Sequence, residues 1–83
     1  MPYDRIKRAK KLAIGTNQTT KALEQATAKE VYVAKDAERR LVSNIEGLSK
    51  QRNIPLVWVE SMKELGKACG IAVGAAAAAI IEE

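Results

Sequence analysis

The run Val31-Tyr32-Val33-Ala34 is short, rich in β-branched residues and apolar enough to form a strand covered on both faces of a sheet. A second run of matching length and character, Leu56-Val57-Trp58-Val59, follows a proline. Between the two runs, Leu41, Ile45 and Leu48 recur at helical spacing and predict a helix that packs through one stripe. Two strands joined by a helix make a βαβ unit, so we expect the two strands to be parallel.

Further helices are predicted on both sides of this unit, each from a signal at its start. Asp4 can cap a first helix that continues to near Gly15, and a second helix is expected over residues 16–26. Asp36 is a good cap for the helix of the βαβ unit. Residues 61–64 have the pattern of a capping box, in which a Ser hydroxyl and a Glu carboxylate each accept from a backbone N–H at the start of a last helix.

The C-terminal segment is compatible with two structures. Gly70 suits the left-handed turn that ends a helix near residue 69. The alanine run of residues 75–79 favours a helix by propensity, whereas a buried strand squeezed between helices would also need small side chains. The order of the other elements predicts an α/β fold in which residues 1–83 form a single domain, a three-layer α/β/α sandwich.

Positive charge is concentrated near the N-terminus. The chain carries 14 Lys and Arg against 10 Asp and Glu, a formal charge of +4. Residues 1–21 hold six of the basic side chains and one acid, which is +5, so the remaining 62 residues sum to −1. Such clustering is typical of a nucleic-acid surface, although a charge run is as often only a solvated face.

The chain lacks the residues that several classes of function require. Cys69 is the only cysteine and there is no histidine, so we expect no internal disulfide, no metal site and no cofactor. Because no pair of carboxylates forms a recognisable constellation, we expect no catalytic residues and no enzyme activity. The longest apolar run, residues 71–81, is far shorter than the roughly 20 residues of a membrane helix. We expect a cytoplasmic monomer.

The run Gly15-Thr16-Asn17-Gln18-Thr19-Thr20-Lys21 places amide, hydroxyl and ammonium groups on the first turns of the second helix. At about 100° per residue, Asn17 and Lys21 fall on one side of that helix and Leu23 on the other. One face can therefore pack while the opposite face stays free for a ligand. The free backbone N–H groups at the helix start add partial positive charge, which suits a phosphate or another electron-rich group.

Three segments together resemble the kink-turn-binding ribosomal protein family, that of the large-subunit protein "seven Ae" with its "thirty e" and spliceosomal fifteen-kilodalton relatives. They are residues 15–21, the run Val33-Ala34-Lys35-Asp36, and the run Leu65-Gly66-Lys67-Ala68-Cys69-Gly70-Ile71-Ala72-Val73-Gly74-Ala75-Ala76. The resemblance covers nearly the whole chain, and the compact length is similar to that of small bacterial YbxF-type members. It implies a four-stranded mixed β-sheet, with the alanine run as the last strand and a short first strand near residues 13–15. The implied ligand is a kink-turn in ribosomal RNA or a riboswitch-like RNA.

In a kink-turn, a three-nucleotide bulge followed by tandem sheared G·A pairs bends an RNA duplex sharply and opens the major groove that A-form RNA otherwise hides. By its position in the motif, Asn17 would hydrogen-bond the sheared pairs, and Lys21 would reach guanine O6 or N7. Gly15 and Thr16 would let the backbone come close to the RNA. Gln18 stands where the family usually has Glu, and its amide can accept from a guanine amino group and can also donate.

The other two segments would complete the interface that the resemblance implies. Asp36 would orient Lys21 or accept from a bulged base, a role that is compatible with capping a helix. The loop Ile71-Ala72-Val73 would cover the flipped-out bulge nucleotide, although on sequence alone an Ile and a Val beside a glycine are more often core. The basic N-terminal segment, through Lys10 and Lys11, and also Lys67 are expected to meet phosphates.

One alternative from a different class stays open. A protein-interaction or assembly module of the same fold would have only non-specific RNA affinity, and the fold alone does not decide between the two functions. Such a module would need an exposed apolar patch away from residues 15–21. The sequence has no surplus of large apolar residues from which to build one.

Overall fold

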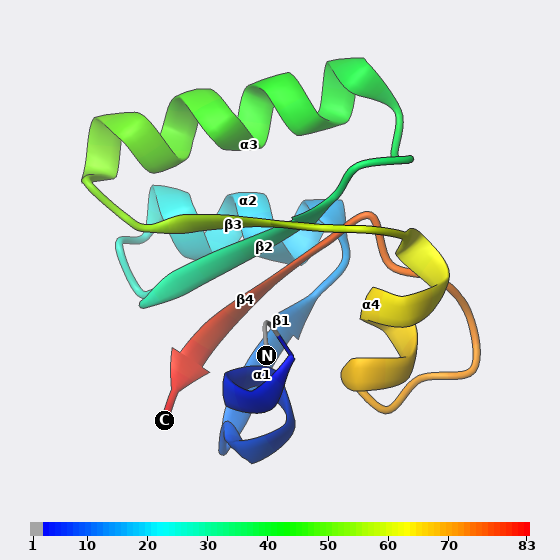
Figure 1. Cartoon of the computed structure of the whole chain (residues 1–83). Helices are drawn as coiled ribbons and strands as arrows, with labels where there is room; N and C mark the ends of the chain where they lie inside the picture. Colours follow the sequence, from blue (N-terminus) through cyan, green and yellow to red (C-terminus); the bar gives the residue numbers. More distant parts are fainter. Residues whose placement is uncertain (1–2) are drawn as a thin grey trace.

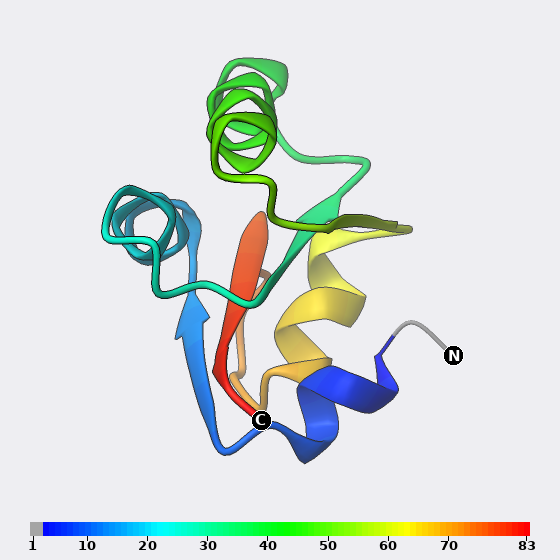
Figure 2. The same ribbon diagram turned by 90° about the vertical axis from the view of Figure 1, so that its left-hand side faces the viewer.

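The computed structural model describes residues 3–83 and arranges them in three layers (Figure 1). The helices are α1 (Asp4–Arg8), α2 (Thr16–Glu24), α3 (Arg39–Arg52) and α4 (Met62–Ala68). The strands are β1 (Lys11–Ile14), β2 (Glu30–Ala34), β3 (Leu56–Val59) and β4 (Ala77–Glu82). Helices α2 and α3 cover one face of the sheet, whereas α1 and α4 cover the other (Figure 2). The predicted α/β/α sandwich is confirmed.

The sheet is mixed and has four strands in the order β1-β4-β2-β3. β2 and β3 are parallel, with Val33 opposite Trp58, as the βαβ pattern predicts. β4 runs antiparallel to both of its neighbours, so that Ala78 lies opposite Ile14 on one side and Tyr32 on the other. The four-stranded mixed sheet implied by the resemblance is therefore confirmed, and β1 and β3 are its edge strands.

The last three residues of the alanine run begin the inner strand β4 (Ala77–Glu82), which resolves the ambiguity of the sequence in favour of a strand. Ala77, Ala78 and Ala79 have no exposed surface, because β4 lies between β1 and β2 and helices cover both faces of the sheet. Small side chains in this strand leave room for larger neighbours such as Tyr32, which is buried in the same cluster as Ala78. Burial and strand pairing thus override the helix propensity of alanine.

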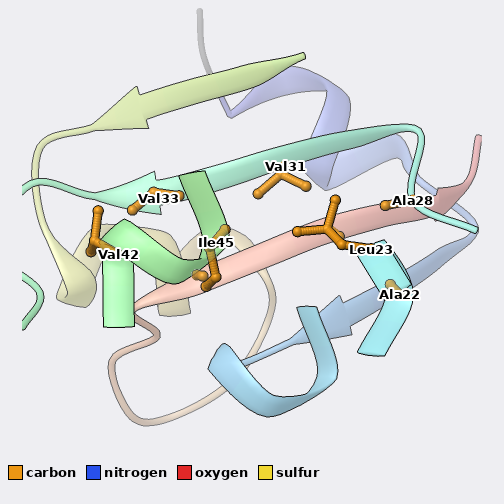
Figure 3. Close-up of a cluster of buried hydrophobic side chains, with 9 residues drawn as sticks. Ala22, Leu23, Ala28, Val31, Val33, Val42 and Ile45 are labelled. Carbon is orange, nitrogen blue, oxygen red and sulfur yellow. The ribbon is translucent and has the colours of Figure 1, made fainter. Parts of the chain in front are cut away.

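Alternating side chains of β2 divide the core into two clusters, one on each face of the sheet. Val31 and Val33 pack with residues of α2 and α3, among them Leu23 and Ile45 (Figure 3). The cluster on the opposite face contains Ile6, Tyr32, Leu65, Ile80 and their apolar neighbours. Every residue of β2 is buried, which agrees with the prediction of a strand covered on both faces.

The predicted first helix is too long. α1 ends at Arg8, and Ala9 has an extended backbone with φ −65° and ψ 140°. Leu12 and Ala13 belong instead to β1, where they lie opposite Ile80 and Ala79 of β4. The strand also starts earlier than residues 13–15. Pairing with β4 decides this segment, since the same apolar spacing fits one turn of helix or a short strand. Asp4 is the first residue of α1 rather than its cap.

Three smaller predictions about burial and length are also wrong. Leu41 is 37% exposed, because α3 turns Val42 and Ile45 toward the sheet instead. Trp58 is 42% exposed, because β3 is an edge strand rather than a strand covered on both sides. α2 ends at Glu24, and Ala26 beyond it adopts a left-handed conformation with φ 58°.

The start and end of α4 match the sequence signals closely. The hydroxyl Oγ of Ser61 accepts a hydrogen bond from the Glu64 N–H at 3.1 Å, which is one half of the predicted capping box. The Glu64 carboxylate accepts from the Tyr3 hydroxyl at 3.4 Å instead of completing the box. Gly70 follows the helix with φ +82°, the left-handed turn that the sequence predicts.

A buried tyrosine hydroxyl is expected to make the fold less stable at alkaline pH. Tyr32 donates to the Glu30 carboxylate, which also forms a 2.9 Å ion pair with Arg5. Burial, followed by this hydrogen bond, raises the pKa of Tyr32 above its ordinary value of 10.0. The neutral phenol is therefore favoured in the folded state. Its contribution to stability is fully present below about pH 10 and is lost as the pH rises further.

We expect the free energy of unfolding to fall more steeply above about pH 10 in the wild type than in Tyr32→Phe, which has no phenol to ionise at this position. Urea unfolding at a series of alkaline pH values measures this difference, because the two proteins differ only in the phenol hydroxyl of residue 32. Parallel curves for the two proteins would contradict the assignment to Tyr32.

Candidate functional site

Hydrogen bonds join the three segments that carry the family resemblance at one edge of the sheet, the edge at which β1 and β2 end and β4 begins. The Gly15 N–H donates to the Ala77 carbonyl at 2.8 Å, and the Ala34 N–H donates to the Ala76 carbonyl at 2.9 Å. The ends of β1 and β2 therefore lie beside the start of β4, since β4 runs antiparallel to β2 and β1. This brings together the turn before α2, the loop after β2 and the loop between α4 and β4 (Figure 1).

The α2 helix starts with an uncompensated positive end. Gly15 is its N-cap and has φ +96° and ψ 162°, a conformation that side-chain-bearing residues rarely adopt. The Gly15 carbonyl accepts from the Thr19 N–H at 2.9 Å, but no side chain of residues 3–83 caps the first-turn N–H groups and no acidic residue lies in that turn. The arrangement favours an electron-rich ligand at this point.

The polar run on α2 divides between solvent and core. Asn17, Gln18 and Lys21 are exposed. Leu23 is fully buried, as the predicted division of the helix requires. Thr19, in contrast, is also fully buried, and its hydroxyl has no hydrogen-bond partner within residues 3–83. Thr19 is therefore part of the packed face and does not belong to the exposed polar surface.

A shallow hollow between α2 and the edge strand β1 holds several of the polar side chains. Its volume is about 260 Å³, and its polar lining consists of Lys11, Gln18, Lys21, Gln25 and Thr27. No carboxylate side chain lines it within the described part of the chain. The structure therefore brings Lys11 together with Gln18 and Lys21. Gln25 was not predicted, although its spacing of four residues from Lys21 places it on the same face of the helix.

Asp36 does not cap α3, which starts at Arg39 with Glu38 in the N-cap position. Its carboxylate oxygen Oδ1 accepts instead from the N–H of Met62, the first residue of α4, at 2.9 Å. No hydrogen bond or ion pair links Asp36 to Lys21 in residues 3–83. The sequence places Asp36 at a helix start, but it does not reveal that the helix is α4, which lies some 26 residues further along the chain.

The loop between α4 and β4 presents an apolar side chain to solvent. Val73 is 70% exposed and Ala72 is also exposed, whereas Ile71 is half-buried and packs against the core. Two backbone hydrogen bonds tie the loop to α4. The Ile71 N–H donates to the Gly66 carbonyl and the Ala75 N–H donates to the Met62 carbonyl, both at 3.0 Å. Val73 is thus an exposed apolar group on an anchored loop and does not form part of the core.

The structure separates the other predicted basic residues from this edge. α1 packs on the opposite face of the sheet from α2 (Figure 2). Lys67 lines a hollow of about 280 Å³ with Tyr3 and Lys7 of the α1 side. Lys10 lies at the other end of β1, where its N–H donates to the Glu82 carbonyl at 2.9 Å. The positive excess of residues 1–21 is therefore divided between the two faces of the sheet, because α1 and α2 are neighbours in the chain but pack on opposite faces.

Other kinds of site receive little support from the described residues. Within residues 3–83, no group of three or more acidic or cysteine side chains is arranged to hold a metal ion. None of the helices in this range is both long and apolar enough to cross a membrane. Burial raises the pKa of the Cys69 thiol, which keeps it in the less reactive protonated form.

Comparisons with known proteins point to one family. The model of the ribosomal protein L7Ae/L30e/S12e/Gadd45 family matches residues 3–83. An RNA-binding protein of Halalkalibacterium halodurans is 52% identical over 80 residues, which cover 96% of this chain and 98% of that protein. The RNA-binding protein YbxF of Geobacillus stearothermophilus is 46% identical over 81 residues, which cover 98% of this chain and 99% of that protein.

A solved structure has the same fold. The 15.5kD RNA-binding protein of Giardia lamblia superposes with a TM-score of 0.88 over 99% of this chain and 72% of that chain, at 24% sequence identity. The relatives are named as RNA-binding proteins, which supports the prediction that this chain is not an enzyme.

Proposed function

This chain belongs to the ribosomal protein L7Ae/L30e/S12e/Gadd45 family, and on that premise we propose that it is an RNA-binding protein that recognises and stabilises kink-turns. The full-length similarity to bacterial RNA-binding proteins, YbxF among them, supports RNA as the ligand. The observation that carries the proposal is the uncapped start of α2, with exposed Asn17, Gln18 and Lys21 at the same sheet edge as the exposed Val73.

The chemistry of this edge fits the bent RNA. A kinked duplex opens its major groove and presents guanine O6 and N7 together with the edges of sheared G·A pairs. Asn17 hydrogen-bonds the sheared pairs, Lys21 donates to guanine, and Gln18 accepts from a guanine amino group. The partial positive charge at the helix start adds attraction that does not depend on the base sequence.

The two flanking features extend the contact on either side. Val73 covers a base flipped out of the bulge, which removes apolar surface of both partners from water. The hollow beside β1 receives the sugar-phosphate backbone, because Lys11 supplies charge and Gln25 supplies an amide that can pair with a ribose hydroxyl. Lys67 lines the hollow on the α1 side and Lys10 lies at the other end of β1, so both would contact phosphates beyond the kink itself.

The mechanism is a shift of population. The free RNA exchanges between extended and kinked conformers, and a protein that contacts only the kinked one stabilises it by the difference in affinity. The RNA becomes a better-defined scaffold for the assembly of ribosomal or riboswitch-like structures. We propose that the protein acts as a cytoplasmic monomer.

The test compares two RNA duplexes of identical composition at one moderate salt concentration. One carries the bulge and tandem G·A pairs, and the other has those pairs changed to Watson–Crick pairs. We expect a preference of about a hundredfold or more, which corresponds to about 2.7 kcal/mol. Equal, salt-sensitive affinity for both would reduce the positive surface to a non-specific electrostatic patch and reject the proposal.

One observation favours the second candidate, a protein-docking module. Trp58 is 42% exposed on the edge strand β3 and lines a hollow of about 230 Å³ together with Lys35, Arg39 and Val42. Aromatic and arginine side chains are common at the centre of protein interfaces. Equal binding of the two RNAs above, together with a loss of partner binding in Trp58→Ala, would favour this function over the first.

A further inference from the structure

A path of two hydrogen bonds links Asp36 to the loop that carries Val73. The Asp36 carboxylate accepts from the Met62 N–H at 2.9 Å, and the Met62 carbonyl accepts from the Ala75 N–H at 3.0 Å. We infer that Asp36 is a positioning residue, which sets the place of the 71–75 loop through the start of α4. The inference rests on the proposed function, because the loop is where the RNA bulge would be covered.

The backbone of the 71–75 loop packs directly against α4. Gly66 leaves no space for a side chain, since an added Cβ would lie 3.0 Å from the Cα of Gly74 and still closer to the Val73 carbonyl oxygen. A Cβ on Gly74 would in turn lie 3.2 Å from the Cβ of Met62. The backbone of the loop is therefore in contact with the first and second turns of α4 at several points. A shift of the helix start is transmitted to Val73.

Asp36 is well placed to control that helix start. α4 is only seven residues long, and two side-chain acceptors hold its first turn: Ser61 accepts from Glu64, and Asp36 accepts from Met62. Ser61 belongs to the segment that leads into the helix, whereas Asp36 comes from the loop after β2, on the same sheet edge as Gly15. Asp36 thus ties the first turn of α4 to the loop after β2, at the sheet edge where the exposed polar face of α2 begins.

The substitutions separate the hydrogen bond from the negative charge. Asp36→Asn keeps a carbonyl oxygen that can accept from Met62, while Asp36→Ala removes the acceptor. We expect Asp36→Ala to weaken kink-turn binding by about three- to tenfold and Asp36→Asn by less than about twofold. Glu60→Ala is the control: it removes an equally negative, exposed side chain that pairs with Lys35 and does not hold α4.

Amide hydrogen exchange of the free protein provides a readout without RNA. We expect the Met62 and Ala75 amides to exchange faster in Asp36→Ala than in the wild type, and to be protected normally in Asp36→Asn and Glu60→Ala. Protected amides in β2 and β4 confirm that each variant is folded. Unchanged exchange at Met62 and Ala75 in Asp36→Ala would overturn the inference, whatever the RNA affinity of the protein.

Double-mutant cycles on RNA distinguish positioning of the loop from the alternatives. We expect Asp36→Ala and Val73→Ala to be non-additive, because they act on the same contact, and Asp36→Ala and Lys21→Ala to be additive. The reverse pattern would mean that Asp36 orients Lys21 and would overturn the inference. A wild type without kink-turn preference would reject the proposed function alone, since the exchange experiment tests the anchoring independently.

Discussion

Gly66→Ala is expected to displace the 71–75 loop and to lower both stability and kink-turn affinity. The added methyl group would meet the Val73 carbonyl and the backbone of Gly74, and backbone atoms cannot rotate away as the end of a flexible side chain can. Overpacking of this kind costs about 1–3 kcal/mol. Urea unfolding measures the stability, and titration of the kink-turn RNA measures the affinity, which should fall because Val73 is moved from its place at the sheet edge.

Gly47→Ala on α3 is the matched control. An added Cβ there has nothing within 4 Å, so the same substitution should raise stability by about 0.5–1 kcal/mol through helix propensity and leave RNA binding unchanged. If Gly66→Ala behaved like Gly47→Ala in both measurements, the close contact between α4 and the loop would have no role in holding Val73.

Lys21→Ala and Asn17→Ala are each expected to weaken kink-turn binding by about 1–3 kcal/mol, the range for one good base contact, which is about 5- to 150-fold in affinity. Both side chains are exposed, so the free energy of unfolding should change little. Lys50→Ala removes the same charge from the last turn of α3, at the opposite end of the sheet, and serves as the control.

The comparison that decides this prediction uses a plain duplex alongside the kink-turn. A base contact is lost only on the kink-turn, whereas a phosphate contact is lost on both RNAs. If Lys21→Ala weakened binding to the two RNAs equally, Lys21 would contribute only charge, and other residues would have to recognise guanine.

Much of the site was accessible from the sequence because its signals are local. The division of α2 into an exposed and a packed face follows from helical spacing, and only the burial of Thr19 departs from it. Ser61 caps the start of α4 and Gly70 makes the left-handed turn after its end, and both effects involve only neighbouring residues. Gln25, in contrast, becomes part of the site only because β1 packs beside α2 and closes the hollow.

Local patterns were enough to predict the parallel pair β2 and β3, the helix joining them and the polar face of α2, because hydrophobic spacing and helix-end signals act over a few residues. Three features became evident only from the packing of the whole domain: Leu12 and most of the alanine run lie in strands, Asp36 holds α4, and α1 lies across the sheet from α2. These outcomes depend on pairing and burial between segments distant in the chain. Such long-range contacts can override local propensity, and no local pattern records them.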